Sequence, residues 1–306
     1  MRFRTLLFGL FLVSAVVIGA APIIPQDQDD VRGAFLTSRP KDKAASPGAT
    51  AKPSRRRPKQ TGSNTSSGTT VKTTTTTSSS SSTNSSATDR TKTTPVNARR
   101  IGLGLTLFMR DSNGLAVRTD PAHVFQKGDR VRVLLETNTD GYLYIFNTTN
   151  SGPPVMLYPN EELDEAGNYL QAHVPFEIPS SLAAEERLRW LVFDENAGDE
   201  RLFFVFTREP LNGVPIEDEL ISMCKSSTSS CPVRPAANLW ATLQNDMKEP
   251  LQVNKTERYG GTQTSGEQVA TTRGLGLAKT DPEPSLIMMA SSTSSKLVTA
   301  LDLIHK

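Results

Sequence analysis

The sequence predicts a mainly β fold, in which a β-sandwich-like module with a short helical insertion is preceded by a long disordered region. From Thr61 to Pro95, 24 of 35 residues are Ser or Thr, and no aromatic residue occurs between Phe35 and Phe108. Such a stretch cannot bury enough apolar surface to offset its chain entropy. After residue 100, short apolar, β-branched and aromatic runs alternate with turn residues, which is the spacing of strands. The foldable module is therefore expected over residues 100–306.

The N-terminus has the pattern of an export signal. Arg2 and Arg4 precede an uncharged apolar run, Leu6 to Ala21, which ends in small residues. This pattern predicts a secretory signal peptide over residues 1–20. An uncleaved membrane anchor is the alternative, because the run approaches the length that spans a bilayer. Both interpretations place the rest of the chain in the periplasm, at the cell surface or outside the cell.

Residues 21–99 are predicted to be a disordered, basic Ser/Thr-rich tether. Residues 31–100 carry a net charge of +12, whereas residues 101–306 carry −9. Export argues against nucleic acid as a partner of the basic part. A solvated spacer that its charge keeps extended is the expected role, while contact with anionic envelope polymers or lipid headgroups and an O-glycosylated stalk remain open. The side chains expected to make this contact are those of Arg55, Arg56, Arg57 and Lys59.

Six runs in the module have the composition of strands. In the run from Arg130, Val131 and Val133 alternate with polar residues, which predicts one buried and one wet face. The runs Tyr142–Phe146 and Leu202–Phe206 are apolar on both faces and are expected at the centre of the sandwich, covered by helix or loop. The six runs are Ile101–Met109, Arg130–Glu136, Tyr142–Phe146, Val155–Tyr158, Leu188–Phe193 and Leu202–Thr207.

The apolar period becomes helical in residues 213–249, which predicts a helical insertion. Cys224 and Cys231 are the candidate disulfide, because an oxidising compartment favours their pairing. So small a ring would add about 2 kcal/mol in the loop-entropy model. The two apolar stripes are Ile216, Leu220 and Met223, followed by Leu239, Leu243 and Met247.

The rest of the module is predicted as a loop followed by a hairpin. Residues 250–284 are Gly/Thr-rich and weakly patterned. Two β-prone runs, Leu286–Ala290 and Leu297–His305, flank small polar residues, which indicates a terminal hairpin over residues 285–306. We expect it to complete the same sandwich, because a lone hairpin is marginal in water.

Four clusters of residues together resemble a known family pattern. The most specific is the run from Asp140 to Asn147, which reads Asp-Gly-Tyr-Leu-Tyr-Ile-Phe-Asn. Over residues 100–212 the chain resembles the bacterial family called domain of unknown function 4384. The resemblance implies an exported, β-sandwich-like accessory module and no established activity. The other clusters are Phe125-x-x-Gly128-Asp129-x-Val131-x-Val133, Leu157-Tyr158-Pro159-Asn160, and Gly198-Asp199-Glu200-x-Leu202 with Arg208-Glu209-Pro210-Leu211.

The sequence has little of the chemistry that catalysis or a metal site requires. His123, His173 and His305 lie far apart, with no second ligand at metal-binding spacing. It contains no nucleophile elbow and no phosphate-binding loop. The acidic run that begins at Glu161 lacks the alternating ligands of a calcium loop and is expected to be a solvated turn. We therefore expect no metal, no cofactor and no enzymatic activity.

Three functional hypotheses follow. The first is a non-catalytic binding or adaptor module of the cell envelope, whose ligand is an unknown protein or glycan. Tyr142, Tyr144 and Tyr158 are its candidate binding residues, because aromatic side chains form flat amphipathic contact surfaces; core packing is the alternative. The second is a structural spacer that uses the basic tether. The third is a hydrolase with paired carboxylates such as Glu161 and Glu200.

Overall fold

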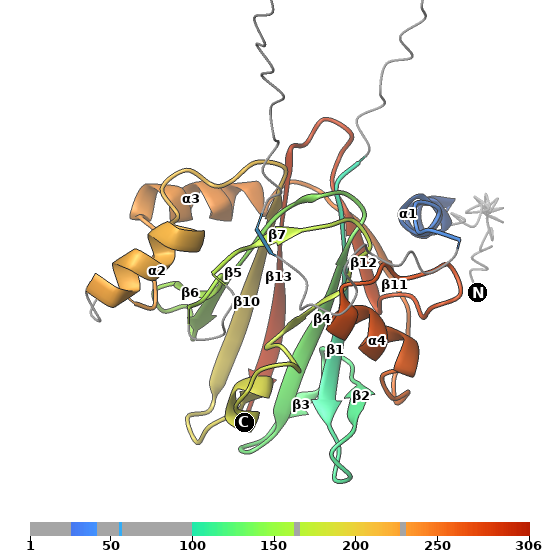
Figure 1. The fold of residues 1–306 in the computed structure, drawn as a ribbon, viewed down its shortest axis with the longest axis horizontal. Helices are drawn as coiled ribbons and strands as arrows, with labels where there is room; N and C mark the ends of the chain where they lie inside the picture. Colours follow the sequence, from blue (N-terminus) through green and yellow to red (C-terminus); the bar gives the residue numbers. More distant parts are fainter. Residues whose placement is uncertain (1–25, 42–54, 57–99, 162–165, 227–230) are drawn as a thin grey trace, which may run out of the picture.

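The computed structural model contains two β-sheets packed face to face (Figure 1). The prediction of a mainly β, sandwich-like fold is confirmed. The predicted signal peptide and the Ser/Thr-rich stretch from Thr61 to Pro95 lie outside the described residues. The structure describes residues 26–41, 55–56, 100–161, 166–226 and 231–306.

The first sheet has the strand order β11-β12-β1-β4-β8, with β2 paired to β1 and β9 paired to β4. These pairs are antiparallel. The central pair, β1 and β4, runs from Leu103 opposite Thr137 to Met109 opposite Val131. The strands are β1 (Gly102–Arg110), β2 (Ala116–Arg118), β4 (Arg130–Thr137), β8 (Phe176–Ile178), β9 (Leu191–Val192), β11 (Gln252–Lys255) and β12 (Leu286–Met289).

The second sheet has the order β3-β13-β10-β5-β6, with β7 paired to β5. Its longest pair, β10 and β13, is antiparallel and runs from Gly198 opposite His305 to Thr207 opposite Lys296. Strand β3 joins the other edge of β13 in parallel. The strands are β3 (Val124–Phe125), β5 (Gly141–Thr149), β6 (Val155–Tyr158), β7 (Tyr169–Leu170), β10 (Gly198–Thr207) and β13 (Lys296–His305).

The main apolar core lies between the two sheets, and both contribute alternate side chains to it. The other face of β4, predicted to be wet, is covered as well, so that prediction is wrong. Arg132 is buried on this face because its guanidinium packs against Trp190, with Cζ 4.1 Å from the ring centroid. Glu136 is buried there because Arg39 pairs with it. Core residues from the central strands include Leu103, Leu105, Val131, Val133, Leu135, Leu143, Ile145, Leu202, Phe204 and Leu301.

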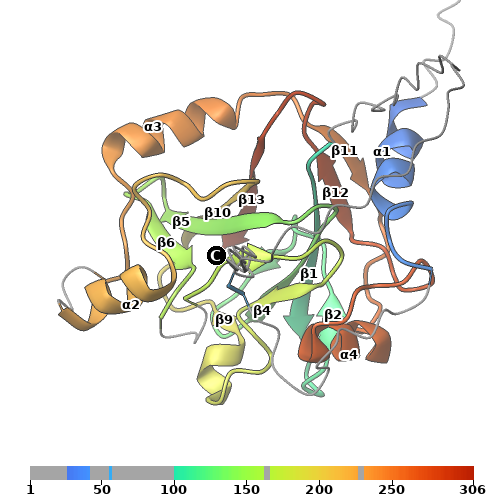
Figure 2. The ribbon, with the colours of Figure 1, turned by 45° about the horizontal axis from the view of Figure 1, so that its top comes forward.

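A helical layer covers the outer face of the second sheet (Figure 2). Helices α2 (Glu217–Ser226) and α3 (Ala237–Asp246) pack over β5 and β10. These two strands are therefore apolar on both faces because one face meets the first sheet and the other meets the helices. Cys224 in α2 is disulfide-bonded to Cys231, with Cα atoms 5.5 Å apart. This is the pairing that the sequence favours.

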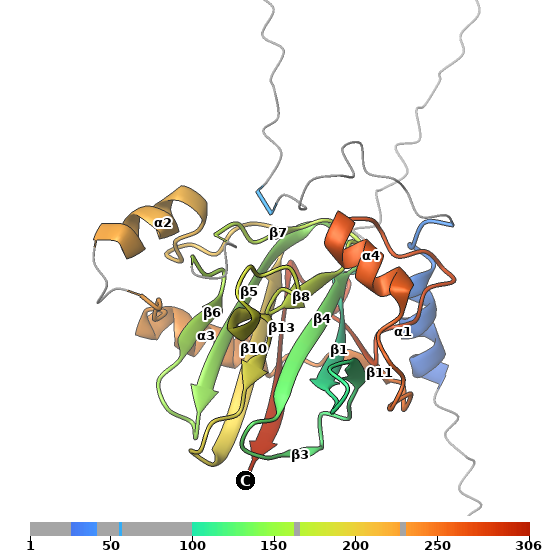
Figure 3. The same ribbon diagram turned by 60° about the horizontal axis from the view of Figure 1, so that its bottom comes forward.

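Helix α1 (Gln26–Leu36) lies against β11 and β12, on the opposite side of the sandwich from α2 and α3 (Figure 3). Val31 and Phe35, one helical turn apart, are buried against β12. The prediction that residues 21–99 are disordered is therefore wrong for residues 26–41. An apolar pair is too short a pattern to stand out in a polar sequence, but the edge of a folded sheet gives it a surface on which to be buried.

Residues 250–284 contain β11 and a helix, α4 (Ser265–Arg273), so the prediction of a loop is wrong. Helix α4 begins with a capping box. The Thr264 hydroxyl accepts a bond from the Glu267 amide at 3.2 Å, and the Glu267 carboxylate accepts one from the Thr264 amide at 2.9 Å. The helix ends at Gly274, whose φ of +64° is the left-handed conformation that glycine adopts most easily. This Thr-x-x-Glu signal is visible in the sequence.

Two further predictions are wrong in detail. Strands β12 and β13 do not form a hairpin, because β12 pairs with β1 and β11 in the first sheet whereas β13 pairs with β10 and β3 in the second. The small polar residues from Ser291 onward instead carry the chain from one sheet to the other. The run Leu188–Phe193 is not one strand: a 3₁₀ helix, η1 (Glu186–Arg189), precedes the two-residue strand β9.

Candidate functional site

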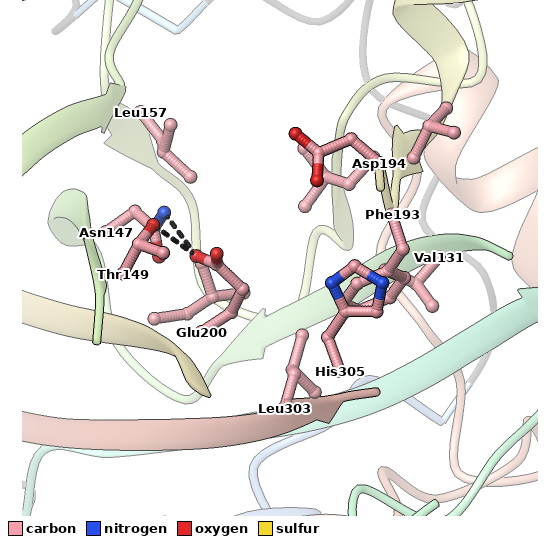
Figure 4. A pocket seen from close by; sticks show the side chains of 12 residues that line it. Val131, Asn147, Thr149, Leu157, Phe193, Asp194, Glu200, Leu303 and His305 are labelled. Carbon is pink, nitrogen blue, oxygen red and sulfur yellow. Dashed lines mark hydrogen bonds between the residues drawn. The ribbon is translucent and has the colours of Figure 1, made fainter. Parts of the chain in front are cut away.

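A cavity of about 250 Å³ opens at the end of the sandwich where β13 ends (Figure 4). The second sheet forms one wall through β5, β6, β10 and β13, and β4, β9 and the loop after β9 form the other. Its lining residues are Val131, Asn147, Thr149, Leu157, Leu191, Val192, Phe193, Asp194, Glu200, Leu202, Leu303 and His305.

The cavity forms where the inward faces of three strands change from apolar to polar. On β10, Leu202 points into the core, and Glu200, two residues earlier, lines the cavity. On β13, His305 stands at the end of the inward face in the same way. Because side chains of a strand alternate between faces, these polar residues continue the core-facing rows. Strand β5 contributes Asn147 and Thr149 from its own inward row.

Glu200 is the anionic group of the wall that β5 and β10 form. Asn147 Nδ2 donates a hydrogen bond to Glu200 Oε2 at 2.8 Å, and Thr149 Oγ1 donates to the same oxygen at 2.9 Å. These bonds orient the carboxylate (Figure 4). In the described part of the chain, no hydrogen bond reaches Glu200 Oε1, and Asn147 Oδ1 is buried without a partner. Glu200 Oε1 therefore offers an acceptor atom to a ligand that donates hydrogen bonds.

The opposite wall carries the ring of Phe193 and a second carboxylate, that of Asp194. The Phe193 ring stacks on that of Phe125 with centroids 4.6 Å apart, and the His305 ring lies 5.1 Å from Phe193. Asp194 accepts hydrogen bonds from the backbone N and the Nδ2 of Asn196, at 2.7 and 2.9 Å. These bonds lower the pKa of Asp194, so its carboxylate is ionised at neutral pH.

The cavity is thus apolar at its floor and anionic at its rim. Leucine and valine side chains form most of the floor, whereas the two carboxylates stand on opposite walls. None of the described residues that line it is Lys or Arg. An anionic rim attracts a positive charge, and an apolar floor favours a hydrocarbon chain. The arrangement fits a ligand with an apolar stem and a cationic, hydrogen-bond-donating head.

The three tyrosines predicted to bind a ligand are instead core residues, so that prediction is wrong. Tyr158 packs between the sheets and its hydroxyl donates to the Gly167 carbonyl at 3.0 Å. Tyr142 and Tyr144 face the helical layer. The Tyr144 hydroxyl accepts a hydrogen bond from the Leu211 amide at 2.9 Å, and burial raises its pKa. The helices and the first sheet cover every face on which these rings could have met a ligand.

The structure separates the carboxylates of the hydrolase hypothesis. Glu200 lines the cavity described above, whereas Glu161 lines a different hollow beside α2. The carboxylate that shares the cavity with Glu200 is that of Asp194. Asp194 lies in the loop after β9, six residues before Glu200 in the chain, and no motif in the sequence marks it as the partner of Glu200.

Part of the basic run is engaged by the folded module itself. Arg55 is 9% exposed and its guanidinium lies over the Phe176 ring. Arg56 forms an ion pair with Asp218. In this arrangement Arg55 is not available to an envelope polymer. Arg57 and Lys59, the other residues expected to make that contact, lie outside the described residues.

A buried polar network joins the N-terminal segment to the sandwich. His173 Nδ1 lies 2.7 Å from Glu136 Oε1, and His173 Nε2 lies 2.7 Å from Ser38 Oγ. This order of groups is that of a catalytic triad. Two contacts favour a structural role: Glu136 is also held by both Arg39 Nε and Nη2, and Ser38 Oγ reaches the Phe35 carbonyl at 2.8 Å. We interpret the network as the attachment of residues 38 and 39 to β4.

The other two histidines have different surroundings. His305 lines the cavity and is buried, whereas His123 is exposed, with its ring 5.0 Å from that of Phe125. Within the described ranges, no three His, Cys, Asp or Glu side chains are grouped so that they could share a metal ion. No helix in those ranges combines the length and apolarity needed to cross a membrane.

Comparison with known proteins finds one family. The model of a family described as Domain of unknown function (DUF4384) matches residues 124–210, which confirms the resemblance over strands β3 to β10. Most of the cavity lies inside the matched segment, while Leu303 and His305 come from outside it. Among curated proteins and among solved structures, none matches this chain.

Proposed function

We propose that this chain, in which residues 124–210 are a domain of unknown function 4384, is an exported, non-catalytic binding module of the cell envelope. The observation that carries the proposal is the cavity with an apolar floor and an anionic rim. Export is supported by the pattern of Arg2, Arg4 and the apolar run to Ala21. The cavity is built largely from the matched segment, so binding would belong to that segment and to the strand β13 that completes it.

The size and charge of the cavity favour a small cationic ligand. At about 250 Å³, it is close to the lower end of ligand pockets, which range from roughly 300 to 1,000 Å³. That space suits one side chain better than an oligosaccharide. A lysine side chain has an apolar stem that would lie against Leu157 and Leu303, and an ammonium that would reach Glu200. We therefore propose an exposed lysine of a partner protein as the ligand.

Titration with Nα-acetyl-lysine methylamide tests this function. We expect the methyl resonances of Leu157, Leu202 and Leu303 to shift in a saturable way, with a millimolar dissociation constant. Glu200→Gln should weaken binding by about 10- to 100-fold, since a hydrogen bond to a charged group contributes roughly 1.5–3 kcal/mol. Glu161→Gln is the matched control, because it changes a carboxylate of the other hollow.

The neutral isostere Nα-acetyl-norleucine methylamide separates charge from apolar contact. It keeps the hydrocarbon stem and lacks the ammonium, so it should bind at least about 10-fold more weakly. Equal shifts with both probes, or an unchanged constant for Glu200→Gln, would contradict the proposal.

A further inference from the structure

Residues 55 and 56 of the N-terminal region lie against the module at a place separate from the cavity. The backbone amide of Tyr169 in β7 donates to the carbonyl of Arg55 at 2.8 Å. Strand β7 pairs with β5 at Gly141 and Tyr142. The segment therefore makes a backbone hydrogen bond beside the sheet, as an added peptide strand does.

The side chain of Arg55 is recognised as an arginine. Its guanidinium lies 4.7 Å from the centre of the Phe176 ring, and its Nη2 donates to the Pro175 carbonyl at 3.4 Å. Phe176 is itself held by Tyr158, whose ring centroid is 4.6 Å away. A planar guanidinium stacks on an aromatic face more favourably than an ammonium does. The site should therefore prefer Arg to Lys.

Gly167 gives the segment room to approach. A Cβ at this position would lie 2.6 Å from the Arg55 carbonyl oxygen, which is closer than real Cβ contacts, and 3.2 Å from the Arg56 nitrogen, which is a tight contact. Gly167 does not have a left-handed φ, so an alanine here would block the approach of a peptide without straining the backbone of the module. The absence of a side chain at Gly167 thus allows the segment to approach.

The second arginine meets an acidic surface. Arg56 Nη2 lies 2.8 Å from Asp218 Oδ1, and the hydrogen bond to Asp218 raises the pKa of Arg56. The first turn of α2 also carries Glu217 and Glu219. The side chains of Arg56 and Asp218 are both substantially exposed, so salt screens their ion pair. The ion pair therefore contributes less to binding than the buried side chain of Arg55 does.

We propose that this surface is a binding site for an extended segment of a partner protein that carries an arginine pair, and that Arg55 and Arg56 occupy it as an internal competitor. We define the arginine site by Gly167, Tyr169, Pro175, Phe176 and Asp218. Because the competitor is part of the same chain, its effective concentration is on the order of millimolar. A partner must therefore bind more tightly than the internal pair, or be present at high local concentration.

Fluorescence anisotropy with a labelled peptide tests the inference. The peptide copies residues 52–59, and the proteins are the whole chain and its Arg55→Ala/Arg56→Ala variant. We expect the variant to bind the peptide saturably. The wild type should bind it at least about 10-fold more weakly, because the tethered arginine pair competes with the peptide. Gly167→Ala in the variant background should abolish binding, and Asp199→Asn, on an exposed part of β10, should not change it.

Peptide changes define the chemistry that is recognised. A peptide with Lys at both arginine positions should lose most of the affinity, whereas one that keeps the arginine pair and replaces its neighbours with Ala and Ser should retain it. Comparable binding by the Lys peptide, or unchanged binding by the Gly167→Ala variant, would overturn the proposal.

A second measurement avoids dependence on the folding of the double variant. In the wild-type chain, a spin label on the peptide should broaden the amide resonance of Tyr169 at millimolar peptide, and the cavity methyls of Leu157 and Leu303 should be much less affected. Absence of broadening at Tyr169, together with no saturable binding by the double variant, would contradict this inference. Neither result would bear on the proposal that the cavity binds a lysine side chain.

Discussion

Glu136→Gln lowers the free energy of unfolding by about 3–5 kcal/mol, as expected when one partner of a buried ion pair is removed. Glu136 and Arg39 are each about 2% exposed, and the carboxylate also meets His173. Glutamine is close in size to glutamate but leaves the Arg39 guanidinium buried without a counter-charge. Chemical denaturation of the two proteins, followed by circular dichroism, measures the difference.

Two controls isolate the buried charge. Lys127→Met breaks the exposed pair with Glu195 and should change stability by less than about 1 kcal/mol. The double replacement Arg39→Met/Glu136→Met removes both charges and should recover much of the loss, because no unpaired charge remains. If Glu136→Gln cost no more than Lys127→Met, residues 38 and 39 would not be attached to the sandwich as described.

Tyr158→Ala lowers the free energy of unfolding by about 3–5 kcal/mol, the usual loss when a buried aromatic ring is truncated. Tyr158 is fully buried between the sheets and packs against Phe176. The conservative change Tyr158→Phe keeps the ring and leaves the Gly167 carbonyl without its donor, which should cost about 1–3 kcal/mol. Thermal or urea unfolding ranks the two variants.

The same pair of variants distinguishes the core from a binding groove. A tyrosine that lined an open groove would lose little stability on truncation, and both variants would then unfold close to the wild type. Leu182→Ala is the matched control, since Leu182 is 40% exposed and a surface replacement usually changes stability by about 0.5 kcal/mol or less. A loss for Tyr158→Ala similar to that of Leu182→Ala would contradict the assignment to the core.

Local pattern was sufficient for the centre of the fold. The runs in β5 and β10 are apolar at every position from Tyr142 to Phe146 and from Leu202 to Phe206, and they lie between the other sheet and a helical layer. The apolar stripes at Leu220 and Leu243 likewise lie in helices whose buried faces they form. In both cases the residues that decide the structure are neighbours in the sequence.

Long-range partners explain what local pattern missed. Helix α1 is buried through Val31 and Phe35 only because β12, more than 250 residues away, lies beside it. Leu286–Ala290 and Leu297–His305 have the composition of a hairpin, yet they pair with strands of two different sheets. Strand composition says that a residue run will pair, but it does not say with which strand.

The cavity could be predicted only in part for the same reason. The hydrolase hypothesis names Glu200 as a functional carboxylate, but its neighbours Asn147 and Thr149 are brought to it by the register of β5 against β10. Asp194 and His305 reach the cavity from a loop and from the end of the chain. The three tyrosines have the chemical type of binding residues, but their burial makes them core residues.

The most direct test of the account is an isotope-filtered nuclear Overhauser measurement with Nα-acetyl-lysine methylamide bound to the whole chain. Lysine methylene protons in contact with the methyl groups of Leu157 and Leu303 are the predicted result, and these contacts should disappear in Glu200→Gln. Contacts confined to the outer faces of the sheets, or none at saturating probe, would contradict a cation-binding cavity at the open end of the sandwich.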